Sequence, residues 1–149
     1  MRHLEQLHQQ AHDANIDVFY LNLGTNIKAV CGMRNGLRGI ALNRALIESA
    51  AEEKVILAEE IMHFETGMLY KITENCNTQH EKIKFRKAEA KVKGATIEKL
   101  LPLADILKHI NKGIVCKYEM AEELDVPTDF LCEAIDYYNR KKRERLNAM

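Results

Sequence analysis

The stretch that decides the fold is EEKVILAEEIMHFETG, residues 52–67. Its apolar residues recur at the spacing of one helix face, which predicts a helix over residues 47–66. Within that helix Glu59 and His63 are four residues apart, so their side chains lie one turn apart on the same face. Glu60 lies about 100° around the helix from Glu59. The stretch therefore presents two alternatives, a solvated helix face or one side of a metal site.

The metal alternative rests on a known spacing. Glu59-Glu60-x-x-His63 has the geometry of H-E-x-x-H, in which positions one and five bind zinc and position two accepts a proton from metal-bound water. Glutamate at position one is chemically acceptable, because a carboxylate oxygen is a normal zinc ligand. The five-residue pattern alone is weakly specific, since it arises by chance on exposed helices. Taken alone, the spacing favours a solvated helix face.

The chain before this helix predicts a small sheet. Residues 1–14 have a helical pattern, and residues 16–23 are rich in the β-branched and aromatic residues of strands. Two further apolar runs, 27–33 and 37–43, flank an Asn-Gly pair, which is a strong hairpin signal. We expect these segments to form a three-stranded antiparallel sheet.

The chain after residue 67 is predicted to be helical apart from a polar loop over 71–82. The expected helices span 83–100, 103–111, 117–124 and 128–142. Strands followed by helices indicate an α+β fold, with the sheet packed on a zincin-like helix pair and a helical hairpin at the C-terminus. A chain of 149 residues predicts one domain over 1–149, divided into a helix and sheet (1–46), metal-site helices (47–101) and C-terminal helices (102–149).

Composition limits the partners and the compartment. The 22 basic and 22 acidic residues balance, so nothing in the total charge calls for a nucleic acid or an anionic membrane as partner. No apolar run approaches the roughly 20 residues of a spanning helix, and the polar N-terminus lacks the apolar region of a secretion signal. Four scattered cysteines without a C-x-x-C pair fit reduced thiols. We therefore expect a cytoplasmic protein.

Three segments, taken in order, resemble the ImmA/IrrE family of metallopeptidases. IALNRAL (40–46) followed by EEKVILAEEIMHFETG is similar to the zinc helix of that family, in which some members carry LAEELGH. RKAEAKVKGATIEKLLPL (86–103) resembles its second metal helix, and MAEELDVPTDFLCEAIDYY (120–138) resembles its closing helix pair. The resemblance covers roughly residues 16–140.

The resemblance implies a site and an activity. Glu59, His63 and Glu89 match the three metal ligands, and Glu60 matches the general base. Three protein ligands leave a fourth position on Zn²⁺ for water, as a catalytic site requires. The expected activity is a metal-dependent endopeptidase that cleaves a repressor or another transcription regulator in phage or mobile-element control, with no direct nucleic-acid or membrane partner.

The glutamate ligand changes the expected chemistry. One histidine and two glutamates leave zinc formally neutral, so the pKa of its water should lie above the ~7 of activated zinc waters. We expect an active enzyme to be slow or to favour alkaline pH. Harder oxygen ligands also leave Mn²⁺ or Fe²⁺ open as the metal.

Two departures from the family pattern define the alternatives. Met62 stands where the family has glycine, and Gly94 stands where related sequences often carry an aromatic residue. Either departure is consistent with a relaxed site. Glu59 in place of the first histidine and the bulk of Met62 motivate the alternative of a catalytically weak or inactive member that acts by binding a regulatory partner. A third alternative is a DNA-binding regulator that uses the last helix pair, but that pair presents the acids Asp129, Glu133 and Asp136 to a polyanion.

Overall fold

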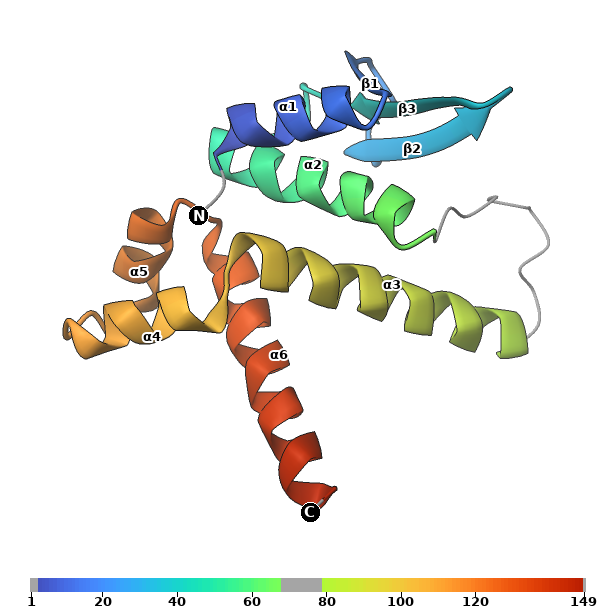
Figure 1. Ribbon diagram of the computed structural model, residues 1–149. Helices are drawn as coiled ribbons and strands as arrows, with labels where there is room; N and C mark the ends of the chain where they lie inside the picture. The colour runs from blue at the N-terminus through green and yellow to red at the C-terminus, as the bar shows by residue number, and fades with distance from the viewer. Residues whose placement is uncertain (1–2, 68–78, 149) are drawn as a thin grey trace.

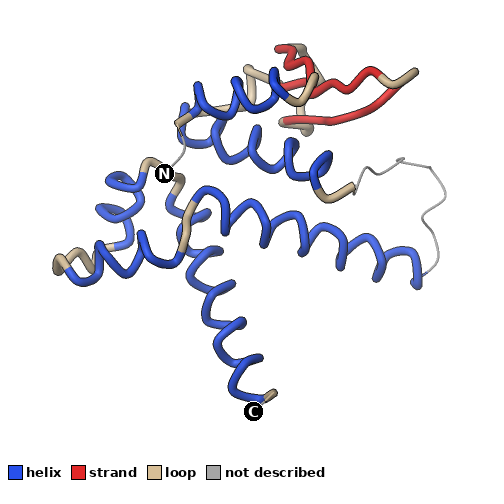
Figure 2. Tube along the Cα trace, viewed as in Figure 1, coloured by secondary structure: helices blue, strands red, loops and turns tan. Residues whose placement is uncertain are grey.

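A computed structural model describes residues 3–67 and 79–148 of the protein (Figure 1). The elements, in chain order, are α1 (Leu4–Asp13), β1 (Ile16–Tyr20), β2 (Ala29–Arg34), β3 (Leu37–Leu42), α2 (Ala50–Glu65), α3 (Gln79–Leu100), α4 (Leu103–Asn111), α5 (Lys117–Leu124) and α6 (Thr128–Asn147). The predicted α+β class is confirmed, with the strands confined to one end of a largely helical molecule (Figure 2).

The sheet is mixed, with strand order β1-β3-β2. The predicted hairpin is present: Asn35 and Gly36 have φ of 52° and 78°, the left-handed values that a tight hairpin turn requires. However, β1 pairs in parallel with β3, so the expectation of an entirely antiparallel sheet was wrong. The reason is that β3 inserts between β1 and β2. The chain reverses once between β1 and β2 and again in the hairpin, which restores the direction of β1.

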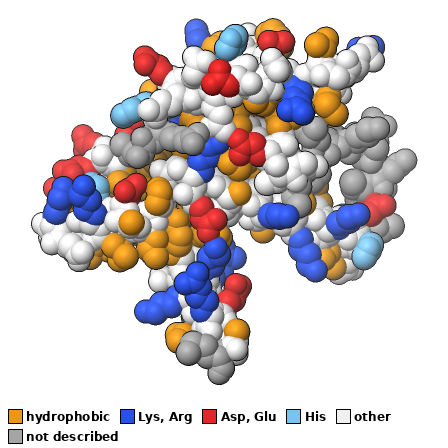
Figure 3. All heavy atoms as spheres, in the orientation of Figure 1, with side chains coloured by type: hydrophobic (Ala, Val, Ile, Leu, Met, Phe, Trp, Pro, Cys, Tyr) orange, Lys and Arg blue, Asp and Glu red, His pale blue; other side chains and the backbone are white. Residues whose placement is uncertain are grey.

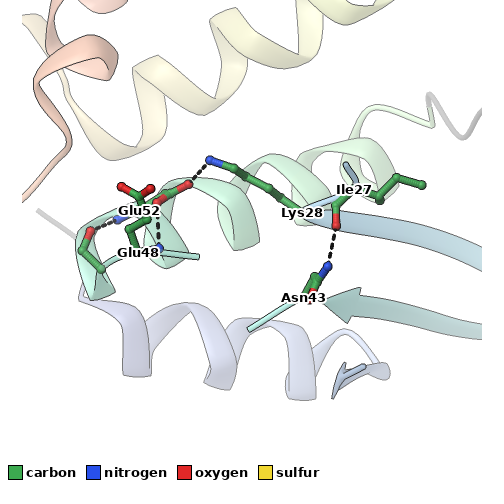
Figure 4. A network of polar contacts seen from close by, with 6 residues as sticks. Ile27, Lys28, Asn43, Glu48 and Glu52 are labelled. Atoms are coloured by element: carbon green, nitrogen blue, oxygen red, sulfur yellow. Dashed lines mark hydrogen bonds and ion pairs between the residues drawn. The ribbon is translucent and has the colours of Figure 1, made fainter. Parts of the chain in front are cut away.

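Asn43 fixes the connection between β1 and β2. Its buried side-chain amide donates to the carbonyl oxygens of Gly24 and Ile27, each at 3.0 Å, and the bond to Ile27 is drawn in Figure 4. Its backbone N–H donates to the carbonyl of Lys28 at 2.8 Å. One side chain thus pairs backbone groups of a loop that the sheet leaves unpaired. Asn43 therefore holds this loop beside the end of β3, ahead of α2.

Helix α2 occupies the centre of the fold. It contacts α1, β2 and β3 on one side and α3 on the other (Figure 1). Leu57, Ala58 and Ile61 are fully buried along it. Ser49 caps its start, because the side-chain oxygen accepts a hydrogen bond from the N–H of Glu52 at 3.1 Å. This position explains why α2 carries an apolar core face and polar side chains that meet neighbouring elements.

Helix α3 begins earlier than predicted. It starts at Gln79 rather than near Ile83, and residues 71–78 of the predicted loop lie outside the described residues. The first turns of α3 are exposed, so no apolar stripe marked them in the sequence. Pro102 separates α3 from α4 as expected.

The C-terminal helical hairpin is present as predicted. Helices α5 and α6 meet at a turn in which Asp125 adopts φ of 55°. The second half of α6 projects from the body of the molecule, and basic side chains of its RKKRER segment gather there (Figure 3). No helix in the described ranges is long and apolar enough to span a membrane.

A buried lysine joins this hairpin to α2. The side chain of Lys54 is 1% exposed, and its Nζ lies 3.3 Å from Oδ2 of Asp125. A buried ammonium group without a partner is costly, so the carboxylate of Asp125 neutralises it where α2 meets the turn between α5 and α6.

Candidate metal centre

The candidate site lies between α2 and α3, which run antiparallel. His63 on α2 faces Glu89 on α3, with Nε2 and Oε1 3.9 Å apart. One turn away, Glu59 on α2 faces Lys93 on α3, with Oε1 and Nζ 3.4 Å apart. Each helix therefore contributes two side chains, four residues apart, to two facing pairs.

The His63–Glu89 pair fits a shared divalent ion. Two donors of a tetrahedral zinc with bonds of about 2.0–2.1 Å lie about 3.3 Å apart, so a contact of 3.9 Å needs only a small adjustment. Imidazole nitrogen and carboxylate oxygen both suit zinc, manganese and iron. The side chain of His63 is 8% exposed and that of Glu89 is 37% exposed, which places the pair at the edge of the core.

Glu60 lies largely buried beside this pair. Burial raises the pKa of its carboxyl, and the neighbouring carboxylates of Glu59 and Glu89 raise it further. A hydrogen bond from the thiol of Cys31 and the nearby His63 oppose that rise. A carboxyl surrounded by all three predicted ligands is in a suitable place to exchange a proton with a group bound between them.

Cys31 of β2 is a member of this cluster that sequence reasoning missed. Burial raises the pKa of its thiol, and the negative charge of Glu60 adds to the effect. Cys31 therefore stays protonated and donates to Glu60. In the sequence, Cys31 is only one of four scattered cysteines. Its contact with Glu60 could not be predicted, because that contact depends on how β2 packs against α2.

Glu59 is held by Lys93 rather than by the His63–Glu89 pair. Nζ of Lys93 lies 3.4 Å from Glu59 and 3.2 Å from Oε2 of Glu133 on α6. Burial lowers the pKa of Lys93, but the two carboxylates outweigh it and raise the pKa above its ordinary value. The structure thus brings together two of the three predicted ligands and directs the third to an ammonium group.

Within residues 3–67 and 79–148, no three side chains of the types His, Cys, Asp or Glu are arranged closely enough to hold a metal. Closing the predicted set requires Glu59 to move away from Lys93 toward His63 and Glu89. Glu59 shares a helix face with His63 and its side chain is partly exposed, so a change of its rotamer is the movement that would bring its carboxylate toward the pair.

A cavity of about 500 Å³ adjoins the site between α2 and the start of α6. Glu59 and Lys93 form one end of its lining, and Lys28 pairs with Glu52 at another part (Figure 4). The apolar part of the lining is Val55, Ile56, Pro127 and Phe130. The candidate site is therefore next to a space that a small group or a side chain can enter.

The two departures from the family pattern are both buried. Met62 is 7% exposed and belongs to the interior side of α2. Gly94 lies against the ring of Tyr137 on α6, and a Cβ added at Gly94 would be 2.9 Å from Cε2 of that ring. Tyr137 thus occupies the space beside α3 that a side chain at position 94 would need.

Comparison of the chain with models of known protein families, with characterised proteins and with solved structures gives no match. The resemblance to ImmA/IrrE peptidases therefore rests on the three sequence segments alone.

Proposed function

We propose that this protein is a metal-dependent endopeptidase of the ImmA/IrrE type. His63, Glu89 and Glu59 would hold one divalent ion, zinc in the first place, with manganese or iron as alternatives for an oxygen-rich donor set. The observation that supports this most is the 3.9 Å contact between His63 and Glu89 across two helices, with the carboxyl of Glu60 beside both.

The metal, when bound, would polarise the scissile carbonyl and make its water more acidic. Residues of the chain itself would transfer the protons. Glu60 would accept a proton from the attacking water and pass it to the leaving amine. The hydrogen bond from Cys31 would keep the Glu60 carboxylate in one orientation, since the thiol stays a donor throughout.

The proposed substrate is a repressor or another transcription regulator, and the proposed compartment is the cytoplasm. The substrate follows from the family resemblance, and the compartment follows from the scattered cysteines, which fit reduced thiols. Direct binding to DNA is disfavoured because Asp129 and Glu133 are exposed on α6 and no excess of positive charge offsets them in the whole chain.

The test is metal content and zinc binding of the purified full chain, beside His63→Ala and Glu89→Ala. We expect about one ion per chain that both substitutions remove. The matched control is His109→Ala, because His109 makes a similar contact with Glu123 at 3.5 Å between α4 and α5. Absence of metal from the unmodified chain in excess zinc, or an equal loss in His109→Ala, would refute the proposal.

The second candidate is a catalytically weak or inactive member that acts by binding a regulatory partner. The contact between Glu59 and Lys93 favours it, because a ligand already paired with an ammonium group is less available to a metal. Metal-free protein that still forms a complex with a regulator would support this candidate over the peptidase.

A further inference from the structure

Lys93 occupies a distinctive place in the candidate centre. It lies on α3 four residues after Glu89, and its ammonium group contacts Glu59 on α2 and Glu133 on α6 at 3.4 and 3.2 Å. It therefore joins three helices through one charge. Lys93 also lines the adjoining cavity.

We propose that Lys93 is a built-in counter-ion that competes with the divalent metal for Glu59, and that Glu133 receives Lys93 when the metal takes Glu59. This inference rests on the proposed metal site. It makes Lys93 and Glu133 positioning residues that set how tightly the ion is held, and neither residue is a ligand.

The competition follows from charge. Without metal, Lys93 offsets the mutual repulsion of two carboxylates on different helices, since its ammonium group contacts both Glu59 on α2 and Glu133 on α6. With a divalent ion bound, the same ammonium group would repel it. Metal binding must therefore displace Lys93 from Glu59.

Glu133 lowers the free-energy cost of that displacement. The two contacts of Lys93 are nearly equal in length, and the side chains of Lys93 and Glu133 are 36% and 51% exposed. Lys93 is thus able to keep one ion pair while it gives up the other, without a change in the backbone. Losing Glu133 would leave Glu59 as the main partner of Lys93 and strengthen the competition.

The test is titration of the metal-free full chain with Zn²⁺ alone, followed by calorimetry or a competing chelator. Lys93 lies about 6 Å along the helix from Glu89, and a unit charge that far from a divalent ion in water-like surroundings changes affinity about tenfold. We expect Lys93→Gln to bind zinc about tenfold more tightly and Glu133→Gln to bind it about threefold more weakly. Lys93→Arg should retain the affinity of the unmodified chain, because the charge remains.

The matched controls are Lys141→Gln and Glu98→Gln. These residues form an ion pair between the same two helices, α6 and α3, and carry the same charges. Glu98 lies about 13 Å along α3 from Glu89, beyond the reach of screened charges, so each control should change affinity by less than about twofold.

The outcomes separate this inference from the function on which it rests. Zinc binding that needs His63 and Glu89 but is no tighter in Lys93→Gln than in Lys141→Gln would overturn the counter-ion role and leave the peptidase proposal standing. Absence of binding in the unmodified chain and in Lys93→Gln alike would overturn both. Circular dichroism of each variant checks that the helices are intact.

Discussion

Gly94→Ala is the substitution whose effect can be worked out most fully. An added Cβ would lie 2.9 Å from Cε2 of Tyr137 and 3.2 Å from both Cζ and Oη. The ring is not free to withdraw. Its hydroxyl hydrogen-bonds with Glu98 and Lys141, and its ring makes a T-shaped contact with the ring of Tyr138, with centroids 5.2 Å apart.

The expected change in the free energy of unfolding of Gly94→Ala is the sum of opposing contributions. Alanine gains about 1 kcal/mol over glycine within a helix. Steric overlap in a packed site costs about 1–3 kcal/mol, and a weakened hydroxyl hydrogen bond costs about 1 kcal/mol more. The net loss in the free energy of unfolding is about 1–3 kcal/mol. For a chain of 149 residues that corresponds to a fall in Tm of roughly 3–10 °C.

The assay is urea unfolding followed by far-UV circular dichroism, with Gly94→Ala, Tyr137→Leu and the double variant. Shortening Tyr137 removes the overlapping ring, so alanine at position 94 should be harmless or stabilising in the Tyr137→Leu background. A Gly94→Ala protein that is at least as stable as the unmodified chain would refute the reasoning, because the steric and hydrogen-bond costs would then be no larger than the gain in helix propensity.

Three other substitutions or conditions give clear expectations. On the proposed function, Glu60→Gln should lower peptidase activity at least about 100-fold while zinc content is retained, because it removes the proposed proton acceptor and none of the proposed ligands. Loss of both together would contradict that role. Since burial raises the pKa of Glu60 and the base works only as a carboxylate, the acid limb of the pH–rate profile should shift to higher pH, and a limb complete well below neutrality would count against this. Asp125→Asn should lower the free energy of unfolding, measured in urea, by about 1–2 kcal/mol, because it leaves the ammonium group of Lys54 buried without a carboxylate. Lys54→Met should be neutral or stabilising, because it removes the buried charge. Equal losses from the two substitutions would contradict this and show that the ion pair itself stabilises the fold.

Local sequence signals predicted the local structure well. The Asn35-Gly36 turn was predictable because its left-handed backbone needs those residue types, and α2 was predictable from its apolar spacing. The parallel pairing of β1 with β3 was not, because residue patterns indicate where the chain reverses and not which strand lies between two others. The start of α3 was not predicted, because its first turns are exposed and have no apolar stripe in the sequence.

The candidate site was predictable in part. The contact of His63 with Glu89 was expected from the family resemblance, which placed both on facing helices. Lys93 was not expected, since a lysine in a run of basic residues looks like a solvated side chain. Its spacing from Glu89 matches that of Glu59 from His63, and two antiparallel helices then necessarily bring Lys93 to Glu59.

The contact between Lys54 and Asp125 bears on how this chain can be shortened. The two residues are 71 positions apart, and one of them supplies a charge that the interior tolerates only with the other present. A truncated protein ending after α3 would keep a lysine ammonium in its central helix and lose the carboxylate that neutralises it. The last two helices are therefore not a detachable module. A deletion meant to isolate the part that carries α2 and α3 should be made together with Lys54→Met, so that the remaining fragment has no buried ammonium group without a partner.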